Sequence, residues 1–470
     1  MKTLRQRIQC LFLLTITGLL FMSAARGQSI ASGSGSETSR KLDEYVAALT
    51  NLGPFSGAVL IAKDGRIAVS KGFGMANLEY DIPNSPQTKF RIASITKQFT
   101  AMTVMMLQER GKLNVQDSAC KYLTGCPESW RDITLHHLLT HTSGVPNIVT
   151  LPEFKEIAMF PATPDELIQK FKNKPLDFQP GEKFNYSNSG YIVLGRIIEK
   201  ASGEAYEDFL RKNIFEPLKM INTGYDRNQT ILKNRAEGYV WRNRFVRDRY
   251  IDMSIPFAAG GLYSTIEDLF LWDQALYTNK LVSRKSLDTI FTPVKENYGY
   301  GWLMGSQFNR KNESHSGSIE GFKTAISRYP DEKASIIILS NIGNVNLSGM
   351  MRDFAAMLFG EKYELPKAPP PPKERPATAA IKIDSKVSDS YVGQYEFPMF
   401  VLNVTKEADR LMAQPSSGGP KAELIPESET KFFIREEQGS QFVFVKDENG
   451  AVTRIDAVLR GQQYKVKKIK

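Results

Sequence analysis

The chain has 470 residues, of which 41% are hydrophobic and 24% are charged, a composition typical of globular proteins and a length sufficient for more than one domain. Its formal charge is +10, and its lysine and arginine residues are interspersed with aspartate and glutamate. We therefore expect neither nucleic acid nor an anionic membrane as a partner.

Residues 1–27 have the pattern of a secretory signal peptide. Lys2, Arg5 and Arg7 precede the apolar run LFLLTITGLLFM, and the small residues of AARG stand before Gln28. No later run reaches the roughly 18 apolar residues that a membrane span needs. We therefore expect an exported protein, periplasmic or secreted, that keeps no transmembrane anchor after cleavage.

A flexible leader is expected over residues 28–39, where serine and glycine are frequent. A first domain over residues 40–364 follows, beginning with a short amphipathic helix near residues 42–52. Two apolar runs over residues 57–74 then flank the sequence KDGR. Because Asp-Gly supports a tight turn, this segment predicts a β-hairpin.

The stretch RIASITKQFTAMTVMMLQERGKL predicts a helix that is apolar on nearly every face from Phe99 to Leu107, as buried helices are. Its first turn carries Ser94 and Lys97, and residues three apart share one face of a helix. A buried lysine with a lowered pKa can take the proton of a serine hydroxyl, while a helix N-terminus stabilises a developing oxyanion. The alternative is a capping serine with a solvated lysine, because Ser-x-x-Lys alone is a short pattern.

The middle of the domain is predicted to be mostly helical. The sequence ITLHHLLTHTSG places His137 and His141 at a spacing that can bind zinc, but no glutamate follows His137. We therefore predict a structural role for both histidines, in capping or in fixing the loop. Cys120 and Cys126 can form a disulfide in an oxidising compartment or stay reduced, and their spacing does not decide between the two.

Strands are predicted again over residues 315–341, and a helix over residues 346–359 ends the unit. Strands at both ends of a segment with a helical middle predict an α+β fold, in which one mixed sheet is completed by distant parts of the chain. The proline-rich residues 365–380 predict a linker, because consecutive prolines lack amide donors. Short strands over residues 381–470 predict a separate small antiparallel barrel or sandwich.

Two further motifs accompany the Ser-x-x-Lys pattern. FNYSNSGY places Tyr186 and Asn188 in a loop before a helix, and HSGS begins a strand with His315, Ser316, Gly317 and Ser318. In order and context these motifs resemble the serine β-lactamase and penicillin-binding superfamily, specifically its class C-like branch. LLTHTSG and AAGGLYSTIEDL extend the resemblance, and the C-terminal module resembles a β-rich domain appended to such hydrolases.

The resemblance implies a β-lactamase/transpeptidase-like fold and a serine hydrolase without metal or cofactor. Ser94 would become acylated, with Lys97 and Tyr186 as general base and then acid. The backbone amides of Ser94 and Ser318 would form the oxyanion hole. The residues implied in substrate binding are Asn188, His315, Ser316 and Gly317.

The substrate stays open at this point. An amide, lactam or ester is expected, from a small molecule or a cell-wall peptide, so that β-lactamase, D,D-carboxypeptidase, D-aminopeptidase and carboxylesterase activities all remain. A penicillin-binding sensor without turnover is the alternative from another class. The C-terminal domain could contact a polymer or mediate self-association.

Two expectations concern protonation. The β-lactamases of this branch usually carry lysine in place of His315, and histidine is mostly neutral at pH 7. We therefore expect turnover of carboxylate-bearing substrates to fall as His315 loses its proton. We also expect a nearby cation, Lys97, to lower the pKa of Tyr186 or to share the proton with it.

Overall fold

A computed structural model describes residues 34–50, 55–242, 244–367, 383–397, 400–416, 421–434, 440–459 and 462–469. The predicted signal peptide and most of the predicted linker lie outside these residues. Among the helices that are described, none is both long and apolar enough to cross a membrane.

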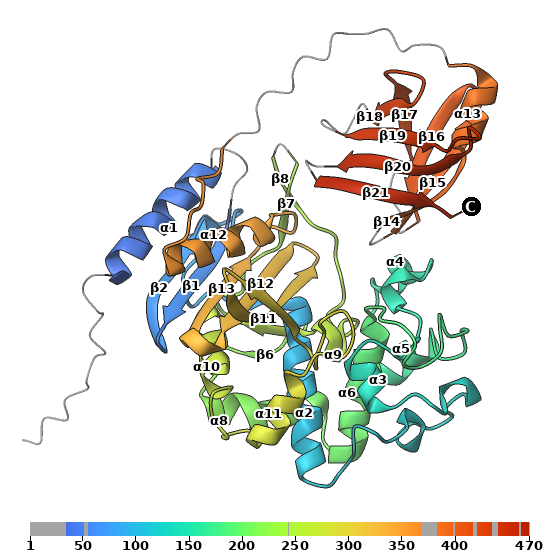
Figure 1. Cartoon of the computed structure of the whole chain (residues 1–470). Coiled ribbons are helices and arrows are strands. Elements are labelled where there is room, and N and C mark those ends of the chain that lie inside the picture. Colours follow the sequence, from blue (N-terminus) through green and yellow to red (C-terminus); the bar gives the residue numbers. More distant parts are fainter. Residues whose placement is uncertain are drawn as a thin grey trace, which may run out of the picture.

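A six-stranded sheet forms the centre of the first domain (Figure 1). Its strand order is β10-β11-β12-β13-β1-β2, and every ladder in it is antiparallel. Because β1 pairs with β13, distant parts of the chain complete one sheet, as predicted, but the sheet is antiparallel throughout and not mixed. The strands are β1 (Gly57–Lys63), β2 (Arg66–Phe73), β10 (Leu303–Gln307), β11 (Arg310–Ile319), β12 (Phe322–Tyr329) and β13 (Ala334–Ser340).

The hairpin turn predicted at KDGR is confirmed, and a second tight turn joins β12 to β13. β1 and β2 are joined through Asp64 and Gly65, whose φ angles are 53° and 69°. β12 and β13 are joined by a short 3-10 turn that ends at Lys333, with φ 45°. Positive φ at these positions is what tight antiparallel connections require, and Asp and Gly adopt it at low cost.

Helices cover both faces of the sheet (Figure 1). α1 (Ser34–Thr50) and α12 (Leu347–Phe359) pack on one face, where Val59 and Ile61 point. Leu60 points to the other face, toward the larger helical part of the domain. Because β1 and β13 are buried on both sides, they are continuous apolar runs without alternation.

Helix α1 begins earlier than the sequence predicts. It starts at Ser34, so the last residues of the predicted flexible leader, 34–39, are helical. Ion pairs at i,i+4 support these turns: Lys41 Nζ lies 2.7 Å from Glu37 Oε1, and Arg40 pairs with Glu44. The prediction of a flexible leader relied on the serine and glycine content of residues 28–39 and did not take this charge pattern into account.

The helical part is inserted between β2 and β10, as predicted. α2 and α6 lie at its centre, and the residues of α2 from Thr96 to Leu107 are all buried. Its helices are α2 (Thr96–Glu109), α3 (Leu135–Leu139), α4 (Phe154–Ile157), α5 (Pro164–Gln169), α6 (Asn188–Ser202), α7 (Tyr206–Leu210), α8 (Glu216–Leu218), α9 (Phe257–Gly260), α10 (Ile266–Ala275) and α11 (Arg284–Ile290). The short strands are β3 (Met75–Asn77), β4 (Ile82–Pro83), β5 (Phe90–Arg91), β6 (Gly224–Tyr225), β7 (Tyr239–Trp241), β8 (Phe245–Arg247) and β9 (Leu262–Ser264).

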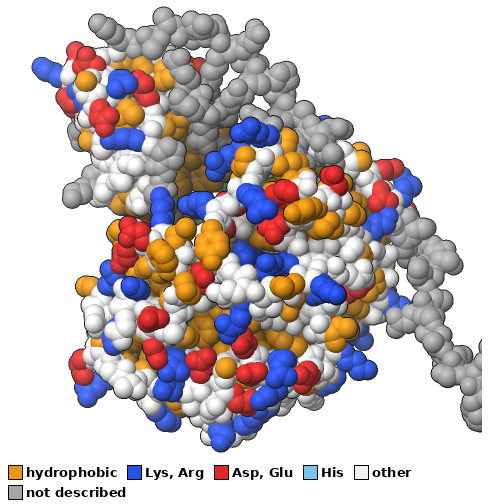
Figure 2. Space-filling view, turned by 180° about the vertical axis from the view of Figure 1, so that it is seen from behind, with side chains coloured by type: hydrophobic (Ala, Val, Ile, Leu, Met, Phe, Trp, Pro, Cys, Tyr) orange, Lys and Arg blue, Asp and Glu red, His pale blue; other side chains and the backbone are white. Residues whose placement is uncertain are grey.

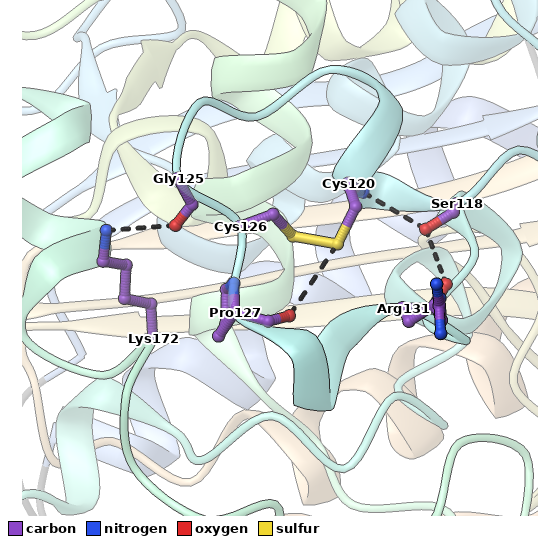
Figure 3. The surroundings of a disulfide bond; sticks show 7 residues. All are labelled: Ser118, Cys120, Gly125, Cys126, Pro127, Arg131 and Lys172. Carbon is purple, nitrogen blue, oxygen red and sulfur yellow. Dashed lines mark hydrogen bonds between the residues drawn. A yellow bond between two sulfur atoms is a disulfide. The ribbon is translucent and has the colours of Figure 1, made fainter.

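Cys120 and Cys126 form a disulfide, which answers the question that the sequence left open (Figure 3). Their Cα atoms are 5.3 Å apart. The loop between them is held from outside, since Lys172 Nζ donates a hydrogen bond of 3.3 Å to the Gly125 carbonyl. The Ser118 side chain accepts a hydrogen bond from the Cys120 amide at the start of the loop.

The C-terminal part is a closed eight-stranded antiparallel barrel with its own apolar core, so the barrel alternative is confirmed over the sandwich. It contains α13 (Ser385–Tyr391), β14 (Gly393–Phe397), β15 (Phe400–Glu407), β16 (Arg410–Pro415), β17 (Ala422–Pro426), β18 (Lys431–Ile434), β19 (Gln441–Lys446), β20 (Val452–Leu459) and β21 (Gln462–Lys468).

Basic and acidic side chains are interspersed over the face of the molecule drawn in Figure 2, as the interspersed charges of the sequence predict. The exact domain boundaries stay predictions.

Candidate active site

Ser94 lies on the 3-10 turn η1 (Ala93–Ile95) that leads directly into α2. The preceding residue, Ala93, has a φ of 48°, a conformation that costs a residue with a Cβ roughly 1–2 kcal/mol. Strain of this kind persists only where the surrounding structure enforces it, and it is found at functional sites. The turn leaves the Ser94 side chain half-buried at the wall of a cavity.

Lys97 is fully buried and points at Ser94, as the i,i+3 spacing predicts. Its Nζ lies 3.1 Å from Ser94 Oγ, 2.8 Å from Asn188 Oδ1 and 2.8 Å from the Ala259 carbonyl oxygen. The last two atoms can only accept hydrogen bonds. In the neutral amine they therefore take both N–H bonds and leave the lone pair for the Ser94 hydroxyl.

Burial sets the protonation state of this lysine. Desolvation holds the pKa of Lys97 well below its ordinary value of 10.5. No carboxylate of the described residues contributes to this shift. Lys97 Nζ also lies over the ring faces of Tyr186 and Tyr191, whose centroids are 4.8 and 5.4 Å away. The surroundings favour the neutral amine, which is the form that can act as a base.

Tyr186 is half-buried, and its hydroxyl interacts with the Ser94 side chain. Desolvation raises the pKa of Tyr186 above its ordinary value of 10.0, and the contact with Ser94 offsets this only in part. The expectation that Lys97 lowers the pKa of Tyr186 is therefore wrong. The reason is geometric: Nζ lies above the ring face of Tyr186, and the lysine itself favours the neutral form. Tyr186 is a neutral phenol that can donate a proton.

Asn147 is a residue that the sequence analysis missed. Its Oδ1 accepts a hydrogen bond of 3.0 Å from the Asn188 backbone amide, and its Nδ2 donates one of 3.2 Å to the Tyr186 carbonyl. It therefore ties together the two positions of the FNYSNSGY motif. The sequence carries one weak signal for it, a polar residue shortly after HTSG in a loop.

The histidines of the middle section have the structural roles that we predicted. His137 and Thr134 form a reciprocal cap at the start of α3. His141 is fully buried, and its Nδ1 accepts a hydrogen bond of 3.1 Å from the Ser187 amide. The centroid of its ring lies 4.2 Å from that of Tyr186. His141 thus fixes the loop that carries Tyr186.

The HSGS motif lies in the second half of β11, beside the turn that carries Ser94, and does not begin the strand as predicted. A Cβ on Gly317 would lie 2.3 Å from Thr324 Oγ1 and 2.4 Å from the Ile92 carbonyl oxygen, so only glycine permits this approach. Ser94 and Ser318 line the same cavity, as an oxyanion hole built from their amides requires. β10 pairs with residues 310–314, so the segment that follows on β11 stays outside that ladder.

His315 is buried, with both ring nitrogens engaged. Nδ1 lies 2.6 Å from the Ser316 carbonyl oxygen, and Nε2 lies 3.0 Å from the Tyr298 hydroxyl, another partner that the sequence analysis missed. Desolvation, assisted by Lys97, lowers the pKa of His315 to about 3. The imidazole is therefore neutral at pH 7, as expected, and the loss of its proton falls near pH 3, outside the physiological range. The low pKa of His315 is caused by burial beside Lys97, which no sequence pattern predicts.

A cavity of about 350 Å³ opens beside Ser94. Ser94, Ala93, Asn188 and Ser318 form one part of its wall, together with Ala259 and Gly260 of α9. Much of the remaining lining is aliphatic or aromatic, including Ile148, Phe154, Ile251 and Ile255. Concave, largely apolar sites with a few polar groups are where proteins bind small ligands.

Comparisons with known proteins agree with this fold. The family model described as Beta-lactamase matches residues 42–360. Penicillin-binding protein 4* of Bacillus subtilis is 33% identical over 407 residues, which cover 81% of this chain and 88% of that protein. Teichoic acid D-alanine hydrolase of Staphylococcus aureus is 26% identical over 315 residues, 65% of this chain and 74% of that protein. The octameric penicillin-binding protein homologue from Pyrococcus abyssi has a TM-score of 0.61 at 27% identity and covers 92% of this chain and 99% of its own.

Proposed function

This chain belongs to the Beta-lactamase family of serine hydrolases, and from that premise we propose that it is an exported enzyme that forms an acyl-enzyme on Ser94. The observation that carries the proposal is the position of Lys97 Nζ, buried and 3.1 Å from Ser94 Oγ with a lowered pKa. We assign to it the hydrolysis of amide, ester or lactam bonds to D-amino-acid acyl groups.

Acylation begins when the neutral amine of Lys97 takes the hydroxyl proton as Ser94 Oγ bonds to the substrate carbonyl carbon. The amides of Ser94 and Ser318 hold the oxyanion, where one donor is worth about 3–4 kcal/mol of barrier. The carbonyl then re-forms, the bond to the leaving group breaks, and Tyr186 gives its proton to the departing atom. The proton on Lys97 restores Tyr186.

Deacylation uses the same groups in reverse. A water molecule attacks the acyl ester and gives a proton to Lys97, and Ser94 Oγ leaves with a proton returned from the pair. Tyr186 is available as a donor because its raised pKa keeps the phenol protonated. Asn188 holds Lys97 through its Oδ1 and can bind the substrate amide with the remaining groups of its side chain.

The neutral state of His315 bears on the choice of substrate. A D,D-carboxypeptidase must bind a free substrate carboxylate, and His315 supplies no charge for it. This favours amide and ester hydrolysis of aminoacyl groups, as in the D-alanine hydrolase relative, over carboxypeptidase or β-lactamase activity. A penicillin-binding sensor without turnover stays the alternative from another class.

Export rests on residues 1–27, whose pattern is that of a signal peptide. The C-terminal barrel would contact a cell-wall polymer or mediate self-association, and the relative from Pyrococcus abyssi is octameric. Deleting residues 366–470 and comparing rates on small and polymeric substrates would separate these roles from stabilisation.

The test of the proposed function is the intact mass of the wild type and Ser94→Ala after brief incubation with benzylpenicillin, beside turnover of a small chromogenic ester. We expect an adduct and ester turnover in the wild type, both lost in the variant. A lasting adduct without ester turnover would favour the sensor. Equal behaviour of the two proteins would overturn the role of Ser94.

A further inference from the structure

The cavity beside Ser94 lies on one side of the reacting centre only. Ser94, Ser318 and Asn188 line it, whereas Tyr186 and His315 are not among its lining residues. The leaving group must depart next to the proton donor, Tyr186. Under the mechanism proposed above, the cavity therefore receives the acyl part of the substrate.

Three charged residues belong to the wall of this cavity: Asp248, Arg249 and Glu320. The Asp248 carboxylate is already occupied, since it accepts hydrogen bonds from the Gly321 amide at 2.6 Å and from the Arg249 amide at 2.8 Å. These bonds join the segment after β8 to the turn between β11 and β12. Asp248 therefore holds this wall together.

Glu320 differs from Asp248 in having an uncommitted carboxylate. It directly follows β11, the strand that carries Ser318, and it is half-buried. Within the described ranges no lysine or arginine lies within ion-pair distance of it, and its own backbone amide is the hydrogen-bond donor that acts on it. Arg249 and Arg91 act on its pKa only from a longer range and lower it less than burial raises it. Burial raises its pKa, as expected for a carboxylate that lacks a cationic partner at close range.

We propose that Glu320 makes the cavity a subsite for acyl groups that carry a free ammonium group, such as the α-amine of an aminoacyl ester or amide. The proposal rests on the Ser94 acyl-enzyme and adds the chemistry of the acyl group. An ammonium ion bound here completes the hydrogen bonding of a half-buried carboxylate, and such a charged bond is less screened than one at the surface.

Arg249 is the competing charge in the same cavity. It is exposed, so solvent and salt screen it more strongly than they screen Glu320. An acyl group with a carboxylate would be directed to Arg249 and away from Glu320. The observations favour the ammonium group, because the more buried charge dominates the field inside a largely apolar cavity.

Ampicillin and benzylpenicillin provide a matched pair of probes, because they differ by one amino group on the acyl side chain. We would measure their acylation rates by intact mass near pH 6.5, where an α-amino group with a pKa of about 7.7–8.0 is protonated. We expect the wild type to react with ampicillin about 10- to 100-fold faster, the value of a hydrogen bond to a charged group. Glu320→Gln should remove this preference and leave the benzylpenicillin rate within about twofold.

Arg249→Gln is the control and should keep the preference for ampicillin. Equal rates of the two penicillins in the wild type would overturn the inference, and so would a Glu320→Gln variant that is slowed equally with both. In these cases acylation of Ser94 would still support the proposed function. If neither penicillin acylates the wild type and ester turnover is the same in Ser94→Ala, the proposed function itself fails and this inference fails with it.

Discussion

Replacing Lys97 by methionine tests the base at the centre of the site. The side chains are of similar length, but methionine neither accepts the Ser94 proton nor donates to Asn188 Oδ1 and the Ala259 carbonyl. Loss of a positioned general base costs about 10²- to 10⁴-fold in rate, or about 3–5 kcal/mol of barrier. Lys97 Nζ makes three short contacts, and the loss of rate comes from the contact with Ser94 Oγ. The contacts with Asn188 Oδ1 and the Ala259 carbonyl hold the amine in place.

The assay is the rate of acylation by benzylpenicillin, followed by intact mass across the pH range. Because desolvation lowers the pKa of Lys97, we expect the wild-type rate to rise with pH through a midpoint well below 10.5. The Lys97→Met rate should be low and independent of pH in that range. Lys172→Met is the matched control, since Lys172 is partly buried and donates to a carbonyl but does not line the cavity.

Stability gives a second readout of the same pKa shift. Folding lowers the pKa of Lys97, so the unfolded chain binds more protons at every pH between the lowered value and 10.5. Wild-type stability should therefore rise with pH across this window, and Lys97→Met should remove that contribution. A Lys97→Met rate within tenfold of the wild type, or a wild-type midpoint at the ordinary lysine value, would refute the reasoning.

Three other predictions follow from the geometry. Gly317→Ala should lower the acylation rate by about 100-fold or more, because its Cβ would clash with the Ile92 carbonyl and shift an oxyanion donor. Gly305→Ala is the control and should match the wild type, because a Cβ at that position meets nothing within 4 Å. A Gly317→Ala variant that keeps its activity would contradict this prediction. Since the pKa of His315 is lowered to about 3, the ratio of kcat/KM for carboxylate-bearing and neutral esters should stay constant between about pH 5 and 8, and superimposable profiles are the expected result. Asn147→Ala should lower kcat by about tenfold through two lost hydrogen bonds, and an unchanged kcat with an unchanged melting temperature would argue against a positioning role.

The sequence by itself determined the features that depend on neighbours in the chain. The spacing of Ser94 and Lys97 predicted their contact, because three residues of helical backbone bring two side chains to one face. Asp64 and Gly65 predicted the first hairpin from turn chemistry, and the regular short strands predicted a C-terminal barrel or sandwich. The order of the motifs was sufficient to identify the family.

The tertiary structure alone decided the chemistry of these residues. The pKa of Lys97 is low, that of Tyr186 is high, and His315 is neutral because helices and strands from distant parts of the chain exclude water around them. The second anchor of Lys97 is a backbone carbonyl of α9, and the partner of Asn188 comes from another loop. Desolvation is a sum over all atoms that surround a charge, and no local pattern of residues contains that sum.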